Sequence, residues 1–142
     1  MSKSKLSADL IANYYRAIYK VEMGVDTFAL HIDQFSEPMY QLMNARNVSN
    51  AAIITAYNPL SQIQSAEKNQ TVHAKLVETL KRRSVPLIDS INIDSLRAWP
   101  DEKSVCILGI DLETTRSIGR KFKQNAVVWI DKDAIPRIVL LR

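Results

Sequence analysis

The sequence has one cysteine, two histidines and three glycines among its 142 residues. A single thiol excludes a disulfide within the chain, which favours a reducing compartment, so we expect a cytoplasmic protein. So few cysteines and histidines argue against a zinc centre, and no phosphate loop or nucleophile motif is present. We therefore expect no metal and no cofactor, and we expect Cys106, which lies in an apolar run, to be a buried structural residue.

Long hydrophobic runs are also missing. No stretch reaches the roughly 18 apolar residues that a membrane span requires, so we expect no contact with a membrane. The content of 46% hydrophobic and 24% charged residues is ordinary for a soluble globular protein. The length suits a single domain over residues 1–142, with an N-terminal helical segment at 1–16 and a sheet-and-helix core at 17–142.

A β-branched apolar run at 52–57 is followed directly by Asn58 and Pro59. This pattern predicts a buried central strand whose end is broken by proline. Ser65 is the preferred cap of the next helix, because Glu67 then lies in its first turn, where the helix dipole favours an acid. A helix that begins at Asn58 instead, with Pro59 in its first turn, is the alternative.

Periodicity predicts the other elements. Helices are expected at 8–16, from Ser36 onward, at 66–83 and at 112–123, and strands at 17–23, 28–32, 52–57, 85–89, 105–110, 126–130 and 135–141. Pro86 favours an edge position for the strand at 85–89. Residues 90–103 have no regular pattern and are expected to form a long loop, a kind of segment that is often functional.

Four helices and about seven strands predict an α/β fold of mixed α+β character. Hairpins at both ends of the chain flank strand–helix–strand units in the middle. We therefore expect one mixed sheet with parallel central strands, antiparallel edge hairpins and about four covering helices. The order of the strands does not follow from these patterns.

Four fragments stand out together: Ile54-Thr-Ala-Tyr-Asn-Pro59, Ser65-Ala-Glu-Lys-Asn69, Trp99-Pro-Asp-Glu-Lys-Ser104 and Phe122-Lys-Gln-Asn-Ala-Val127. In this order and spacing they resemble the bacterial family of short proteins called domain of unknown function 3293. Its motifs are T-A-W/Y-N-P, E-x-N, W-P-x-E-x-S and F-G-Q-N-A. The resemblance covers roughly residues 17–130 and implies a complete single-domain protein of bacterial or phage type, with no assigned chemistry.

The sequence departs from these motifs at two positions. Tyr57 stands where the family often has tryptophan, which keeps an aromatic side chain with a polar group. Lys123 replaces the glycine of F-G-Q-N-A, so the last helix is expected to end differently here.

The fragments place polar and aromatic side chains at the ends of predicted strands and helices. Amide and carboxylate groups can bind the polar edges of a ligand. The ligand-binding set that this predicts consists of Tyr57, Asn58, Asn69, Trp99, Glu102, Ser104, Gln124 and Asn125. The structural alternative is that these side chains cap helices and turns, or satisfy one another in a buried network.

Three functions are compatible with these residues. The leading hypothesis is a module that binds a polar or anionic small molecule, such as a nucleotide. The second is a hydrolase or transferase with Glu102 as general base and His73 assisting, which requires the two side chains to meet in space. By itself, His73 is expected to be a hydrogen-bonded core residue.

The third hypothesis is association with nucleic acid or the ribosome through basic helices, which the net charge of +4 permits. The residues that would carry it are Lys81, Arg82, Arg83, Arg116, Arg120, Lys121 and Lys123. They would form one patch only if the two helices are neighbours, and a solvated basic surface is the simpler alternative.

The segment around Trp99 carries the last expectation. Pro100 restricts Trp99 to an extended backbone, which aims its indole in one direction. We expect this indole to be mostly buried against the sheet. We also expect Glu102 to be hydrogen-bonded to a polar residue from 58–69 or to Gln124 or Asn125.

Overall fold

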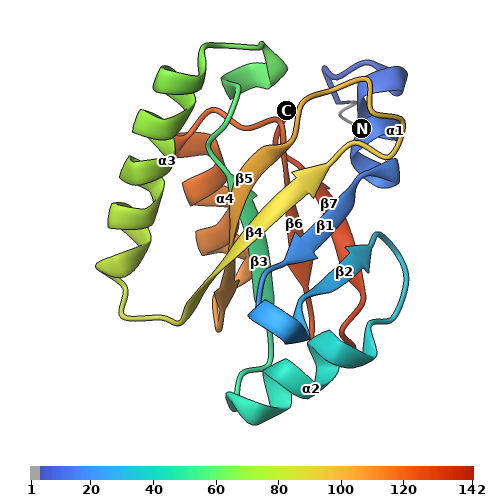
Figure 1. Cartoon of the computed structure of the whole chain (residues 1–142), viewed down its shortest axis with the longest axis vertical. Coiled ribbons are helices and arrows are strands. Elements are labelled where there is room, and N and C mark those ends of the chain that lie inside the picture. The colour runs from blue at the N-terminus through green and yellow to red at the C-terminus, as the bar shows by residue number, and fades with distance from the viewer. Residues whose placement is uncertain (1–3) are drawn as a thin grey trace.

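The computed structural model describes residues 4–142, so residues 1–3 of the expected N-terminal segment lie outside it. Within the described residues the chain forms four α-helices, two short 3-10 helices and seven strands (Figure 1). In chain order they are α1 (Ala8–Arg16), β1 (Ile18–Val21), η1 (Gly24–Asp26), β2 (Phe28–His31), α2 (Glu37–Ala45), β3 (Ala51–Thr55), η2 (Pro59–Ser61), α3 (Ala66–Lys81), β4 (Leu87–Ile93), β5 (Glu102–Leu108), α4 (Leu112–Lys121), β6 (Ala126–Ile130) and β7 (Pro136–Leu140).

The helices begin where the capping residues predict. The side-chain oxygen of each N-cap accepts a hydrogen bond from the amide three residues later, in Ser7, Ser36, Ser65 and Asp111. Each bond satisfies one of the amides that a helix leaves unpaired in its first turn. The preferred start of α3 after Ser65 is thereby confirmed, and Asn58–Gln64 is a connection that contains only η2.

The seven strands form one sheet in the order β2-β1-β4-β5-β3-β6-β7, and every neighbouring pair is antiparallel. The prediction of parallel central strands is therefore wrong, although the antiparallel hairpins at both ends of the chain are present. The fold is an α+β fold with an entirely antiparallel sheet.

The error arises from which strands are neighbours. The strands β3 and β4, joined by α3, run in the same direction, but β5 lies between them and is antiparallel to both. Likewise β5 and β6, joined by α4, run in the same direction with β3 between them. Each helical connection therefore skips one strand, as in split strand–helix–strand units.

The strand β4 is also longer and more central than predicted. It spans Leu87–Ile93 and pairs with both β1 and β5, so it is not an edge strand. Pro86 lies just before the strand and removes no hydrogen bond from the ladder. Because Ile91, Asn92 and Ile93 continue β4 and β5 begins at Glu102, the predicted loop of residues 90–103 is reduced to residues 94–101.

The two faces of the sheet have different coverings. Helices α3 and α4 pack on one face, where Leu76, Leu80 and Ile118 are buried against β3 and β5. The other face curls inward, because the segment after β2 reaches β7 at the opposite edge. There Asp33 N donates to Pro136 O at 2.8 Å and Ser36 N donates to Ala134 O at 3.0 Å.

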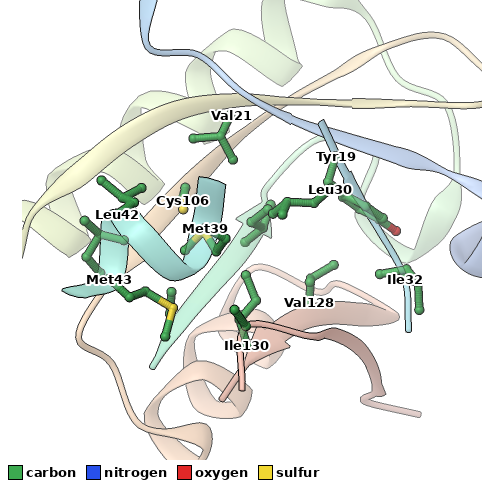
Figure 2. Close-up of a cluster of buried hydrophobic side chains, with 14 residues drawn as sticks. Tyr19, Val21, Leu30, Ile32, Met39, Leu42, Met43, Cys106, Val128 and Ile130 are labelled. Atoms are coloured by element: carbon green, nitrogen blue, oxygen red, sulfur yellow. The ribbon is translucent and has the colours of Figure 1, made fainter. Parts of the chain in front are cut away.

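The inside of this curl is apolar at one end and polar at the other. Helix α2 covers the apolar end with Met39, Leu42 and Met43, which pack against Cys106 and Ile130 (Figure 2). Cys106 is buried as predicted, and burial raises the pKa of its thiol to about 12. Helix α1 lies at the opposite end from α2 (Figure 1). Among residues 4–142, no helix has the length and apolar character needed to cross a bilayer.

Candidate functional site

A pocket lies inside the curl of the sheet, at the end covered by α1. Its volume is about 140 Å³. Apolar side chains from the sheet and from α1 line one part of it, including Leu10, Ile53 and Val128. Polar side chains line the rest, and they include Asn58 and Glu102. The pocket therefore combines an apolar wall with a polar edge, as ligand sites commonly do.

Asn58 is the central residue of the polar edge. It follows β3 and has a left-handed backbone with φ of 46°, which asparagine tolerates better than most residues. Its Nδ2 donates to Glu102 Oε2 at 2.8 Å. Its Oδ1 accepts Asn69 Nδ2 and Gln64 N, both at 3.0 Å. The predicted structural role of Asn58 as a turn residue and its place in the pocket are thus both present.

Asn69 supports this arrangement from behind. It lies on α3, is buried and does not line the pocket. Its Oδ1 accepts Asn58 N at 2.9 Å and Gln64 Nε2 at 2.7 Å. Asn69 therefore fixes the backbone and side chain of Asn58, and of the predicted ligand-binding residues it is one that the structure keeps away from the pocket itself.

Glu102 presents a carboxylate to the pocket from the first residue of β5. Its Oε2 accepts hydrogen bonds from Asn58 and from Trp99 Nε1, the latter at 3.1 Å. The predicted hydrogen bond from residues 58–69 to Glu102 is confirmed. Burial raises the pKa of the Glu102 carboxyl, while the hydrogen bonds from Asn58 and Trp99 act in the opposite direction.

Trp99 is half-buried rather than mostly buried. Its loop leaves β4 through Asp94, whose Oδ2 accepts the backbone amides of Ala98 and Trp99 at 2.9 Å each. These bonds hold the loop while the indole N–H is directed to Glu102. The indole therefore lines the pocket and is not packed wholly against the sheet, since its polar edge has a carboxylate partner there.

The segment after α4 closes the pocket on another side. Gln124 Nε2 donates to Tyr57 O at 3.2 Å, and Asn125 Nδ2 donates to Ser61 Oγ at 2.9 Å. All four of these residues line the pocket. Lys123 has φ of 55°, a left-handed conformation that glycine adopts most easily. This explains why glycine suits that position in the F-G-Q-N-A motif.

Ser104 lies near the site but does not line the pocket. Its hydroxyl donates to Asn92 Oδ1 at 2.7 Å and shares a 2.6 Å hydrogen bond with Ser90. Asn92 does line the pocket, so Ser104 orients a pocket residue from β5.

Most of the residues that line the pocket were not predicted from the sequence. Among them are Tyr14 from α1, Tyr19 from β1 and Asn92 from β4. Tyr19 donates to the carbonyl of Tyr14 at 2.8 Å, and Figure 2 shows its hydroxyl oxygen pointing away from the methionines of α2. Both tyrosines fit the apolar periodicity of their elements, so nothing in the local pattern distinguishes them from core residues.

His73 does not join Glu102. It lies on α3, packs edge to face with Tyr57 at 6.0 Å between ring centroids, and does not line the pocket. The expectation that His73 is hydrogen-bonded is wrong, because no residue among 4–142 pairs with its buried Nδ1. Burial lowers the pKa of His73, with a further lowering by Lys103 and an opposing effect of Asp89. The geometry gives no support to a Glu102–His73 acid–base pair.

The basic side chains do not form one patch. Helices α3 and α4 lie on the same face of the sheet and run in opposite directions, so the end of α3 is near the start of α4. There the charge of Arg83 adds to the lowering of the Asp111 pKa by hydrogen bonds from Thr114. The residues Arg120, Lys121 and Lys123 lie at the other end of that face. Arg82 and Arg116 are moreover paired with acids on their own helices.

Comparison with known protein families gives a match over the part of the chain that contains the four fragments. The family model described as protein of unknown function (DUF3293) matches residues 54–127, just over half of the chain. The chain belongs to this family. The search of curated proteins and the search of solved structures each found no match.

The DUF3293 segment supplies only part of the pocket. Asn58, Trp99, Glu102 and Gln124 lie inside the matched range, whereas Tyr14 and Tyr19 lie before it. The matched part of this DUF3293 protein thus provides the polar edge, and the preceding α1 and β1 add two aromatic side chains to the pocket.

Proposed function

We propose that this DUF3293 protein is a binding module whose pocket under α1 takes a small molecule with both a polar and an apolar part. Support comes from convergence: polar side chains that are distant in sequence meet at one edge of a single apolar-walled pocket. Binding sites for small molecules commonly combine such a wall with a few placed polar groups.

The hydrogen bonding of Glu102 carries the proposal. Both of its protein donors, Asn58 Nδ2 and Trp99 Nε1, converge on Oε2. Within residues 4–142, no hydrogen bond is made to Oε1 of this pocket-lining carboxylate. Among residues 4–142, His73 Nδ1 is the one fully buried side-chain nitrogen or oxygen without a partner, so Glu102 Oε1 is accessible rather than buried. This oxygen can therefore accept a hydrogen bond from a ligand in the pocket.

The volume and the lining of the pocket limit the kinds of ligand that it can hold. A cavity of similar volume accepts a single aromatic ring, so about 140 Å³ suits a compact molecule. Within the described chain, no lysine or arginine lines the pocket, so the phosphates of a nucleotide would find no cationic partner there. The nucleotide and other anionic ligands considered from the sequence therefore receive no support.

The test is a screen of single-ring fragments against the ¹⁵N-labelled protein, followed by amide chemical shifts. Ala17 lines the pocket and Ala29 is exposed on β2, so Ala17→Leu and Ala29→Leu add the same volume inside and outside it. We expect fragments that shift Trp99 and Asn58 resonances, with binding lost in Ala17→Leu and retained in Ala29→Leu. Fragments that shift only residues away from the pocket, or bind Ala17→Leu equally well, would contradict the proposal.

A further inference from the structure

We propose that the ligand of the pocket is a small organic cation with an ammonium group, held between Glu102 Oε1 and the aromatic side chains that line the pocket. This inference rests on the proposed binding function and specifies its chemical class. It depends on three features: the charges around the pocket, the hydrogen-bond donors already in use, and the aromatic lining.

The charged groups that line the pocket are both acids. Among residues 4–142 they are Asp94 and Glu102, and no lysine or arginine lines it. Asp94 already binds backbone amides with both oxygens, through Leu96 N on Oδ1 and through Ala98 N and Trp99 N on Oδ2. Glu102 is therefore the carboxylate that remains able to accept from a ligand.

Two cations near the pocket act elsewhere. Lys103 follows Glu102 on β5, so its side chain is directed to the α3 face. There its charge lowers the pKa of His73 in addition to the effect of burial. Arg142 Nη1 donates to Asn125 Oδ1 at 3.2 Å and does not line the pocket. The charge of Glu102 is thus not neutralised inside the pocket, and an incoming cation would supply the missing partner.

The hydrogen-bond donors around Glu102 are already in use. The side-chain N–H groups of Asn58 and Trp99 both bind Glu102, and Gln124 Nε2 donates to Tyr57 O. Tyr19 donates its hydroxyl proton to Tyr14 O. An ammonium ion requires acceptors, and Glu102 Oε1 is a charged acceptor without a protein donor in the described chain.

The aromatic lining suits the same ligand. Tyr14, Tyr19, Tyr57 and Trp99 all line the pocket with Glu102. The negative face of an aromatic ring attracts a cation within about 6 Å of its centre, and several rings together form the cages that recognise ammonium groups. A carboxylate set among four aromatic residues therefore favours an organic cation over an inorganic one, because the rings also provide apolar contact.

Three single-ring probes of similar size test the charge: benzylamine, which is protonated at neutral pH, neutral benzyl alcohol and anionic benzoate. Their dissociation constants are measured by titrating the indole N–H resonance of Trp99. We expect benzylamine to bind at least about tenfold more tightly than benzyl alcohol, because both can donate to Glu102 but only the ammonium group adds an opposite charge and a cation–π contact. Benzoate should bind more weakly than the alcohol.

Glu102→Gln should remove the preference for benzylamine while keeping the binding of benzyl alcohol. The control is Glu22→Gln, which changes the net charge equally at an exposed position outside the pocket and should keep the preference. Equal binding of all three probes, or a preference that survives Glu102→Gln, would overturn the ammonium ligand and leave the binding function standing. Absence of binding by every probe would overturn both.

Discussion

The side-chain amide of Asn58 donates a 2.8 Å hydrogen bond to Glu102 Oε2, across 44 positions of sequence. It links the end of β3 to the start of β5, its antiparallel neighbour in the sheet. Through Asn69 the same side chain is tied to α3. One asparagine therefore joins the crossover helix, the central strand and the carboxylate of the pocket.

Asn58→Ala should lower the free energy of unfolding by about 3 kcal/mol or more, because it removes three side-chain hydrogen bonds and places alanine at φ of 46°. Urea unfolding measures the loss. Asn47→Ala is the control, since Asn47 has φ of 54° at an exposed position without a side-chain hydrogen bond in the described chain. A similar loss in both variants would show that the cost comes from alanine in a left-handed backbone and not from the lost hydrogen bonds of Asn58.

Glu102→Gln should raise the free energy of unfolding at pH 7. Burial raises the folded-state pKa of Glu102 above its ordinary value near 4.5, so the folded protein binds more protons than the unfolded chain between those two pKa values. The wild type therefore loses stability as pH rises through this window. The advantage of Glu102→Gln should shrink below pH 4.5, and an advantage independent of pH would contradict the burial of this charge.

Trp99→Phe should raise the pKa of Glu102 further. The substitution keeps an aromatic ring and removes the indole N–H, which donates to Glu102 Oε2 at 3.1 Å. This hydrogen bond stabilises the ionised carboxylate, so its loss favours the protonated form. Carboxyl ¹³C shifts recorded against pH measure this pKa directly. A lower or unchanged pKa in Trp99→Phe would show that the indole N–H does not act on Glu102 in solution.

Gly119→Ala should lower the free energy of unfolding by about 1–3 kcal/mol through overpacking. A Cβ at Gly119 would lie 2.6 Å from Leu141 Cδ1 and 2.7 Å from Val127 Cγ1, where α4 approaches the sheet. Ser117→Ala provides the control at an exposed position of the same helix. Thermal unfolding of both variants measures the difference, and an unchanged or higher stability of Gly119→Ala would exclude close packing at this point.

Helix α1 should exchange its amide hydrogens faster than α2, α3 and α4. None of its nine residues, 8–16, is buried, whereas each of the other helices has at least three buried residues. Hydrogen exchange followed by mass spectrometry measures this order. Because Tyr14 from α1 lines the pocket, a ligand should slow the exchange of α1, and slow exchange without ligand would contradict a loosely held helix.

The pocket could be predicted in part. Asn58, Trp99, Glu102 and Gln124 were identified because they occupy motif positions at the ends of strands and helices, and the structure brings all of them to one pocket. Tyr14 and Tyr19 were missed because they have the spacing of ordinary core residues. That they face a pocket depends on α1 and β1 lying opposite residues far along the chain.

By itself, the sequence determined the helices, their N-caps and most strands, because hydrogen bonds and side-chain periodicities within a few residues specify them. Only the tertiary structure decided that β5 lies between β3 and β4, and hence that the sheet is antiparallel. The same strand, inserted at that position, places Glu102 beside Asn58. Packing across the whole sheet decides which strands are neighbours. Two strands that are joined by a helix can be adjacent in the sheet or can have another strand between them.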